Sequence, residues 1–321
     1  PDALSTPPNA PAAPVARMIK PDSSTESENH LYIWSRESLL LSRKRAITPS
    51  SFWKLLMAAI LLSALDDIAW TFNIRGCDVK FNPVVVAYAY LSEEKKVIFI
   101  EKCKLSNNVV EYFNENEIEI MPYSEIENFL LSLDSSTKVL ADPARVNYRL
   151  CNTLCEKGIL VAATSPIAMM KSVKNNIEIE GTRNALIRDG VAMTNFLYWL
   201  DTNIGKIEMS EISIAEKLRS FRAEQPMFVG ESFGTIAGYE GHGAIVHYRA
   251  TEESDAKLQP KGFVLVDSGG QYLDGTTDIT RTIPLGELTD EEKALFLGEN
   301  ACRFYGLDNL VDLPYIKNMS E

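Results

Sequence analysis

The chain has 321 residues, of which 45% are hydrophobic, and 44 acidic against 32 basic residues give it a net charge of -12. That length predicts about two domains, and the apolar fraction is typical of soluble globular proteins with extensive cores. We expect no nucleic-acid partner, because an acidic surface repels a phosphate backbone. The five cysteines include no Cys-x-x-Cys pair. This argues against a disulfide framework or a structural zinc site and favours a reducing, cytoplasmic location.

Residues 1–51 are rich in Pro, Ala, Ser and Thr and have no sustained apolar period. A segment of this composition buries too little apolar surface to offset the conformational entropy lost on ordering. We expect residues 1–51 to be a disordered or unrelated leader.

An apolar run at residues 53–65 follows the basic residues 43–45 and mimics two parts of a signal peptide. It begins too deep in the chain for such a signal, and it is shorter than the roughly 20 residues that span a bilayer. We interpret it as a buried helix or strand entering the first domain, and we expect no membrane association.

A first domain is expected at residues 52–165, where strand-like and helix-like segments alternate. The expected strands lie at 84–90, 96–100 and 138–141, and the expected helices at 107–113 and 123–133. Such alternation predicts an α/β domain around a mixed sheet. A further helix follows Asp142-Pro143 and ends near Gly158, and the domain boundary is placed after Ser165.

A second domain is expected at residues 166–321, with helices first and strands after them. Apolar residues at helical spacing predict two helices within 167–201. Ser213 and Glu216 have the spacing of a capping box and predict the start of the next helix. Three strands separated by glycine-rich turns predict an antiparallel sheet. They lie at 233–237, 244–248 and 263–266.

The stretch 263–282 has the pattern of a β-hairpin. Apolar residues lead into Asp267, Asp274-Gly275 is a turn signal, and a β-branched run leaves through Asp278. Since side chains alternate along a strand, Asp267 shares a face with Leu265, and Asp278 shares a face with Thr280. If the arms pair, the two aspartates lie across from each other.

Two interpretations of this aspartate pair are open. Neighbouring carboxylates repel unless they share a proton or a cation, and oxygen-rich pairs suit hard divalent metals, so a metal site is the first hypothesis. In the alternative, Asp267 ends a strand, Asp274 makes the turn and Asp278 is solvated. The local pattern alone does not decide between the two.

The hairpin, together with Gly243-Ala-Ile-Val-His-Tyr248, resembles the catalytic domain of Xaa-Pro aminopeptidase (aminopeptidase P), of the creatinase and methionine aminopeptidase pita-bread superfamily. Segments 63–83 are similar to the opening of that family's middle domain, and 171–183 to its first catalytic-domain helix. The motifs occur in the family's order between Ser63 and Ile283. The resemblance implies a creatinase-like mixed-sheet domain followed by the first half of a pita-bread metallopeptidase domain.

The resemblance also implies an activity, the removal of the first residue from peptides with proline second, at two divalent cations that are usually manganese. Asp267 would chelate one metal and Asp278 would bridge both. His247 matches the histidine that faces the substrate and stabilises the tetrahedral intermediate without binding metal. From the residue alone, a hydrogen-bonded structural imidazole at a strand end is the alternative. His242 holds a position where the family usually has a polar loop residue, and no role is assigned to it.

Other ligands that the family needs are not found. The remaining histidine and two glutamates come from the second half of the family's catalytic domain, yet no histidine follows His247 and the glutamates from Glu287 onward match no motif. From Lys293 the sequence is expected to depart from the family, whose amino-terminal domain is also missing. We therefore expect a fragment, inactive by itself, of an enzyme that is a homodimer at full length.

Two alternative functions are kept. A creatinase-like hydrolase that works without metals is disfavoured by Asp267 and Asp278. The other alternative is a non-catalytic binding or dimerisation fragment that carries half of an inactive metal site. The absence of the family's remaining histidine and two glutamate ligands favours this alternative.

Overall fold

The computed structural model describes residues 32–33 and 58–307. They form two compact units, one ending at Val173 and the other beginning at Lys174. The expected boundary after Ser165 therefore falls inside the first unit, where helix α7 (Pro166–Ser172) belongs. Most of the expected leader lies outside the described residues. Its described part, strand β1 (Tyr32–Ile33), pairs antiparallel with β3 (Ile74–Arg75).

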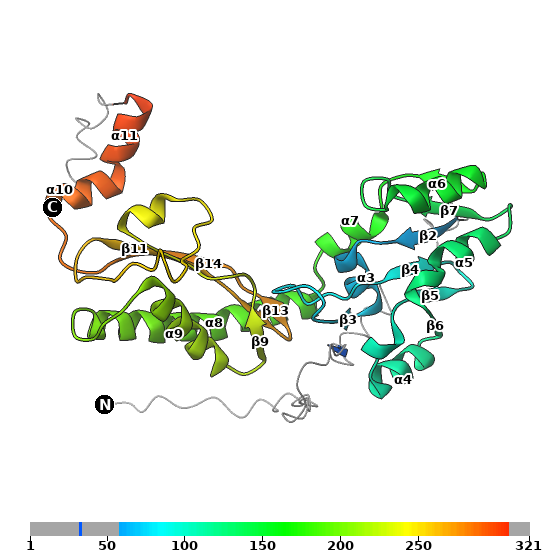
Figure 1. Ribbon diagram of the computed structural model, residues 1–321, viewed down its shortest axis with the longest axis horizontal. Coiled ribbons are helices and arrows are strands. Elements are labelled where there is room, and N and C mark those ends of the chain that lie inside the picture. Colours follow the sequence, from blue (N-terminus) through cyan, green and yellow to red (C-terminus); the bar gives the residue numbers. More distant parts are fainter. Residues whose placement is uncertain (1–31, 34–57, 308–321) are drawn as a thin grey trace, which may run out of the picture. The chain divides into compact units, whose positions relative to one another are not determined.

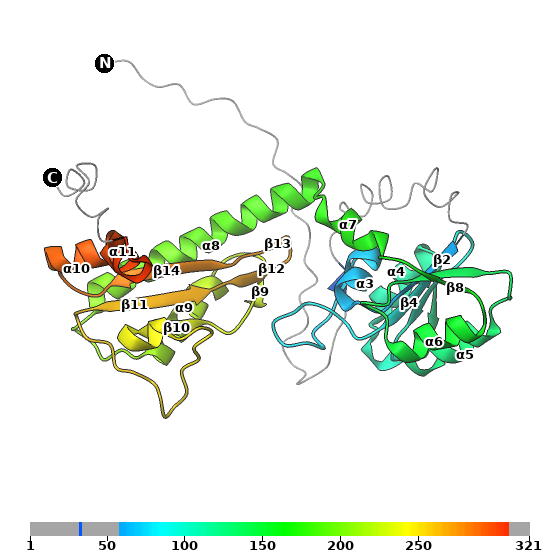
Figure 2. The same ribbon diagram turned by 90° about the horizontal axis from the view of Figure 1, so that it is seen from above.

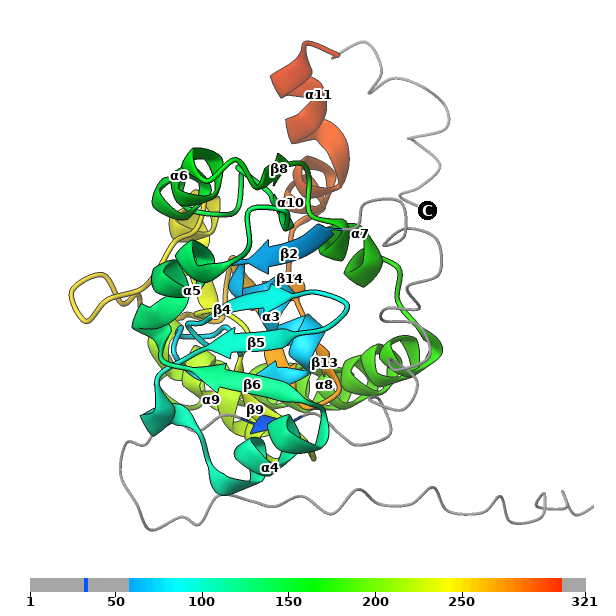
Figure 3. The same ribbon diagram turned by 90° about the vertical axis from the view of Figure 1, so that its right-hand side faces the viewer.

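A six-stranded mixed sheet forms the centre of the first unit (Figures 1 and 3). In order across the sheet, its strands are β6 (Ile118–Met121), β5 (Lys96–Phe99), β4 (Tyr88–Leu91), β2 (Ala58–Leu62), β7 (Lys138–Ala141) and β8 (Leu160–Ala162). Strand β4 is antiparallel to both of its neighbours, and the other neighbouring strands are parallel. The predicted mixed-sheet domain is confirmed.

Strand β2 shows why the sheet is buried on both sides. Ile60 and Leu62 belong to one core, and Ala59 and Leu61 belong to a second core. A strand covered on both faces needs an unbroken apolar sequence, which explains the run that resembles a signal peptide. Of the two interpretations of this run, the strand is correct for residues 58–62.

The helices of the first unit divide between these two cores. Residues of α3 (Leu65–Phe72), α4 (Asn107–Glu115) and α7 line the first core, and residues of α5 (Ile126–Ser132) and α6 (Tyr148–Glu156) line the second. Short 3-10 turns, η1 (Lys102–Lys104) and η2 (Tyr123–Glu125), precede α4 and α5.

The second unit begins with two helices, which pack on strands that follow them. The helices are α8 (Asn176–Asn203) and α9 (Glu211–Ala223), and Figure 2 shows α8 running along β11 and β14. One three-stranded sheet has the order β10 (Ile236–Tyr239), β11 (Phe263–Ser268), β14 (Ile279–Pro284). The other has the order β13 (Gly275–Thr276), β12 (Gly270–Tyr272), β9 (Phe228–Glu231). Phe196 of α8, Leu218 of α9 and Val266 of β11 meet in the core.

Three short helical segments follow the strands: α10 (Asp290–Ala294), the π-helical turn η4 (Leu295–Glu299) and α11 (Asn300–Tyr305). Thr289 caps α10 in a box with Glu292. None of the helices among the described residues is both long and apolar enough to cross a membrane.

Two local predictions in the second unit were wrong. The capping box of α9 is formed by Ser210 and Ser213, so Ser213 lies inside the helix and does not begin it. The expected strand at 244–248 is the 3-10 turn η3 (Glu240–Ala244) followed by a tight turn. The second correction concerns the segment around His247, where tertiary contacts override local propensity.

Candidate metal-binding site

The two arms of the predicted hairpin do pair, and their register locates both aspartates. Strands β11 and β14 are antiparallel, and Asp267 lies opposite Thr280. The pairing continues with Ser268 opposite Ile279, so Asp278, which immediately precedes β14, is a diagonal neighbour of Asp267. Diagonal positions lie about 7–8 Å apart between Cα atoms. The aspartates therefore lie across from each other on the paired arms, at diagonal and not directly opposed positions.

The aspartates share the more exposed face of this pair of strands. Val264, Val266 and Ser268 are fully buried, whereas Asp267 between them is half-buried. Asp278 and Thr280 are exposed, as alternation along the other arm requires. The predicted sharing of a face is confirmed.

The turn of the hairpin explains the register. Tyr272 pairs with Gly275, so the two turn residues are Leu273 and Asp274, one position earlier than the Asp274-Gly275 signal indicated. The same register holds from this turn to β11 and β14, and between them the Thr277 amide donates to the Gly270 carbonyl at 2.9 Å. A Cβ atom at Gly269 would lie 2.0 Å from the Thr277 carbonyl oxygen, so glycine is required beside Asp278.

Helix α8 holds the tip of the hairpin. A Cβ atom at Gly181 would lie 2.3 Å from the Asp274 carbonyl oxygen, so the glycine allows backbone and helix to touch. The Arg188 guanidinium forms an ion pair with the Asp274 carboxylate. The turn aspartate thus anchors the hairpin, a role that its turn signal did not reveal.

A buried ion pair between α8 and α9 also binds the hairpin. Arg222 of α9 donates from Nε and Nη2 to the Asp189 carboxylate of α8, at 2.7 and 3.1 Å. The Tyr272 hydroxyl donates to Asp189 Oδ1 at 2.9 Å. Burial raises the pKa of the Tyr272 hydroxyl well above its ordinary value of 10.0, and the Asp189 charge raises it further. The hairpin carrying Asp267 and Asp278 is thus fixed to both helices.

His247 lies on the segment between β10 and β11. Its side chain is exposed, and its backbone has a positive φ of 55°. Within residues 58–307, no hydrogen bond to its imidazole is present, so the alternative of a hydrogen-bonded structural imidazole at a strand end finds no support there. The next residue, Tyr248, is buried and donates its hydroxyl to Glu211 at 2.9 Å.

The donor chemistry of the aspartate pair fits part of a divalent-cation site. Asp267 accepts one side-chain hydrogen bond, from the Thr280 hydroxyl at 2.8 Å. Neither Asp267 nor Asp278 has a lysine or arginine partner among the described residues, so two neighbouring carboxylates have no protein cation to offset their repulsion. Hard oxygen ligands of this kind suit Mg²⁺ or Mn²⁺. The described part of the chain contains no cluster of three or more His, Cys, Asp and Glu side chains able to hold a metal, so these two residues do not complete a site.

Comparisons with known families agree with this architecture. Residues 43–178 match the creatinase/prolidase N-terminal domain, and residues 180–301 match metallopeptidase family M24. The fold and the site thus define a creatinase-type α/β domain joined to M24 pita-bread sequence. The second match includes residues 293–301, so the expected departure from the family at Lys293 is wrong for these residues. The first match also includes residues 43–51 of the expected leader.

Sequence identity to individual proteins identifies the family more specifically than the domain matches do. The chain is 37% identical over 243 residues to Xaa-Pro aminopeptidase ApepP of Drosophila melanogaster and 40% identical over 237 residues to Xaa-Pro aminopeptidase 1 of Dictyostelium discoideum. The alignments cover 74% and 73% of this chain, and 39% and 37% of those proteins. The chain belongs to the Xaa-Pro aminopeptidase family, and it spans less than half the length of these relatives.

The chain is also similar in structure to a solved X-prolyl aminopeptidase. The X-prolyl aminopeptidase of Caenorhabditis elegans, described as a cytosolic enzyme with a di-nuclear active site, superposes with a TM-score of 0.72 at 28% identity. The superposition covers 84% of this chain and 46% of that one. The X-Pro aminopeptidase of Thermotoga maritima shares the fold, with a TM-score of 0.54 at 20% identity over 74% of this chain and 65% of that one.

The buried polar residues that support the hairpin and the segment around His247 have no recognisable pattern in the sequence. Asp189 and Arg222 occupy buried helix positions, and Glu211 is the first residue of α9. Charged residues on a predicted helix are usually solvated. Burial distinguishes these three residues from the other charged residues of the helices, and burial is seen only in the folded structure.

Proposed function

We propose that this chain contributes Asp267, Asp278 and His247 to an Xaa-Pro aminopeptidase that releases the first residue of peptides with proline second. The observation that carries the proposal is the pairing of β11 with β14, which places both aspartates on one accessible face without a protein cation between them. Family membership supplies the substrate class, since the relatives carry that activity in their names.

Each residue has a separate role in this proposal. Asp267 would hold one cation, with its carboxylate oriented by the Thr280 hydroxyl. Asp278 would bind that cation and a second one, and we propose manganese for both. Such cations, when bound, activate water and polarise a carbonyl group. His247, exposed on the segment between β10 and β11, would donate a hydrogen bond to the peptide and stabilise the oxyanion that forms.

We further propose that the chain has no appreciable turnover by itself. Two carboxylates leave both cations under-coordinated, and two-metal hydrolysis depends on the fixed positions of the remaining ligands. Within residues 58–307 those ligands are not assembled. A cytoplasmic location and a homodimer at full length belong to the same proposal, supported by the description of the C. elegans relative as cytosolic and by family membership.

The test is a chimera in which residues 180–283 of this chain replace the matching segment of the Drosophila relative. We expect manganese-dependent release of the first residue from a peptide with proline second. Asp278→Asn should lower kcat by at least about a thousandfold, as the loss of a metal ligand does to metal-assisted hydrolysis. The matched control is Asp201→Asn, at an exposed position of α8, which should leave kcat unchanged. Full activity of the Asp278→Asn chimera would exclude the proposed metal role.

One observation favours a second candidate, a non-catalytic binding or dimerisation protein. The described residues lack a three-ligand metal cluster, as a dead half-site would. An inactive chimera that folds normally and binds no manganese would support this second function.

A further inference from the structure

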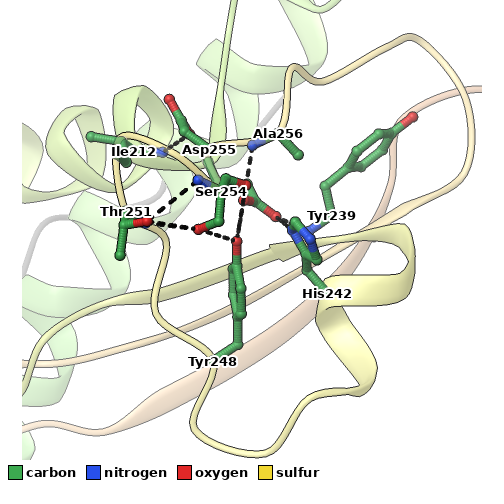
Figure 4. A network of polar contacts seen from close by, with 9 residues as sticks. Ile212, Tyr239, His242, Tyr248, Thr251, Ser254, Asp255 and Ala256 are labelled. Atoms are coloured by element: carbon green, nitrogen blue, oxygen red, sulfur yellow. Dashed lines mark hydrogen bonds and ion pairs between the residues drawn. The ribbon is translucent and has the colours of Figure 1, made fainter.

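The Glu211 carboxylate accepts hydrogen bonds from Tyr239, His242, Tyr248 and Ala256, which are labelled in the network of Figure 4. The residue is fully buried at the start of α9. Its Oε1 atom accepts from the Tyr239 amide at 2.7 Å and from His242 Nδ1 at 2.9 Å. Its Oε2 atom accepts from the Tyr248 hydroxyl at 2.9 Å and from the Ala256 amide at 3.1 Å. Two donors at each oxygen use all four acceptor positions of the carboxylate.

This arrangement explains how a charge is tolerated in the core. A buried carboxylate without partners is strongly unfavourable, whereas charge-assisted hydrogen bonds and a helix N-terminus both stabilise it. Because a carboxylate only accepts, the His242 Nδ1 atom carries the proton in this contact. The loss of any one donor would leave part of a buried charge unpaired, so the four bonds support one another.

The four donors fix one segment of the chain at several points. They lie between residues 239 and 256, which is most of the connection from β10 to β11. The His242 ring stacks on the Tyr248 ring, with centroids 4.5 Å apart and planes at 27°. The Tyr248 hydroxyl also lies 3.2 Å from the Ser254 hydroxyl, and the Thr251 amide donates to that hydroxyl at 2.9 Å.

His247 depends on this network through its neighbour. Its φ of 55° lies in the left-handed region, which a residue with a Cβ atom rarely adopts unless the surrounding structure enforces it. Its own imidazole has no hydrogen bond within the described part of the chain. The adjacent Tyr248 is therefore the nearest fixed point, and its hydroxyl is held by Glu211.

We infer that Glu211 is a positioning residue, which sets the backbone of His247 through the hydrogen bond to Tyr248. The consequence for catalysis rests on the proposed function, since it assumes that His247 faces the peptide substrate. The positioning itself requires neither substrate nor metal. An experiment can therefore disprove the positioning of His247 and its proposed catalytic role independently of each other.

The experiment compares Tyr248→Phe and Glu211→Gln with the unmodified chain. The matched control is Tyr239→Phe, because the Tyr239 hydroxyl donates to the Lys261 carbonyl at 3.1 Å and does not touch Glu211. The chain has three histidines, so the His247 signals can be assigned by NMR. Two readouts are the amide-to-Hα coupling constant of His247, which reports φ, and hydrogen exchange of residues 240–256 by mass spectrometry.

We expect Tyr248→Phe to move the His247 coupling constant and to speed exchange in residues 240–256 by about tenfold, the effect of losing a hydrogen bond to a buried charge. Tyr239→Phe should change neither. The inference would be overturned if Tyr248→Phe left both readouts as in the control. It would also be overturned if Glu211→Gln lowered stability without altering the His247 coupling constant, because Glu211 would then be purely structural. In the active chimera, a moved coupling constant with unchanged kcat and KM would retain the positioning and remove the catalytic role of His247.

Discussion

Asp189 and Arg222 form an ion pair whose side chains are 2% and 0% exposed, and this pair joins the two helices that support the hairpin. The contact uses two parallel hydrogen bonds, the geometry in which arginine binds a carboxylate most strongly. The hairpin is fixed to the same pair through Tyr272. The position of the hairpin that carries Asp267 and Asp278 therefore depends on this buried ion pair.

Arg222→Met should lower the free energy of unfolding of the second unit by about 3–5 kcal/mol, because it leaves Asp189 charged and unpaired in the core. The measurement is urea unfolding. Arg219→Met is the control, since Arg219 lies on the same helix with its side chain 62% exposed, and its loss should cost less than about 1 kcal/mol. Equal effects of the two substitutions would show that burial of the pair is not what stabilises the unit.

Gly181 and Gly190 of α8 should respond in opposite directions to alanine. A Cβ atom at Gly181 would lie 2.3 Å from the Asp274 carbonyl oxygen, so Gly181→Ala should destabilise the second unit by about 1–3 kcal/mol. At Gly190 no atom lies within 4 Å of an added Cβ, so Gly190→Ala should stabilise it by about 0.5–1 kcal/mol. Thermal unfolding of both variants tests this pair, and a stabilising Gly181→Ala would contradict the close packing of the hairpin tip.

Tyr272 should make stability depend on alkaline pH. Its pKa is raised by burial and by Asp189, so the folded state favours the protonated hydroxyl. That contribution is complete below the ordinary pKa of 10.0 and is lost progressively as the pH rises above it. The free energy of unfolding of the unmodified chain should therefore fall more steeply above about pH 10 than that of Tyr272→Phe. Parallel curves for the two proteins would argue against a buried, protonated Tyr272.

Local sequence patterns predicted those features of the fold that depend on residues close together in the chain. Alternation along 263–267 and 278–282 gave the hairpin and its shared face, since each arm carries its own period. The diagonal offset of Asp267 and Asp278 could not be derived from the sequence. It follows from a turn at Leu273 and Asp274, whereas the Asp274-Gly275 signal predicts a turn one residue later.

Nonlocal contacts explain the remaining errors. The sequence around His247 has the composition of a strand, yet the segment forms turns, and Tyr248 within it donates to the buried Glu211. The sequence pattern indicates no role for His242, although its ring stacks on Tyr248 and its Nδ1 atom donates to Glu211. Both features depend on a residue more than thirty positions earlier in the chain, which no local pattern connects to the loop.

The most direct test of the proposed metal site is manganese-induced broadening of NMR signals in this chain, since a paramagnetic ion broadens the signals of the nuclei nearest to it. We predict that the first amide signals lost are those of residues 265–268 and 278–281, on the face shared by Asp267 and Asp278. Asp278→Asn should abolish this selectivity, and the exposed control Asp201→Asn should retain it. Unchanged broadening of the same residues in Asp278→Asn would contradict the central claim that the two aspartates bind the metal together.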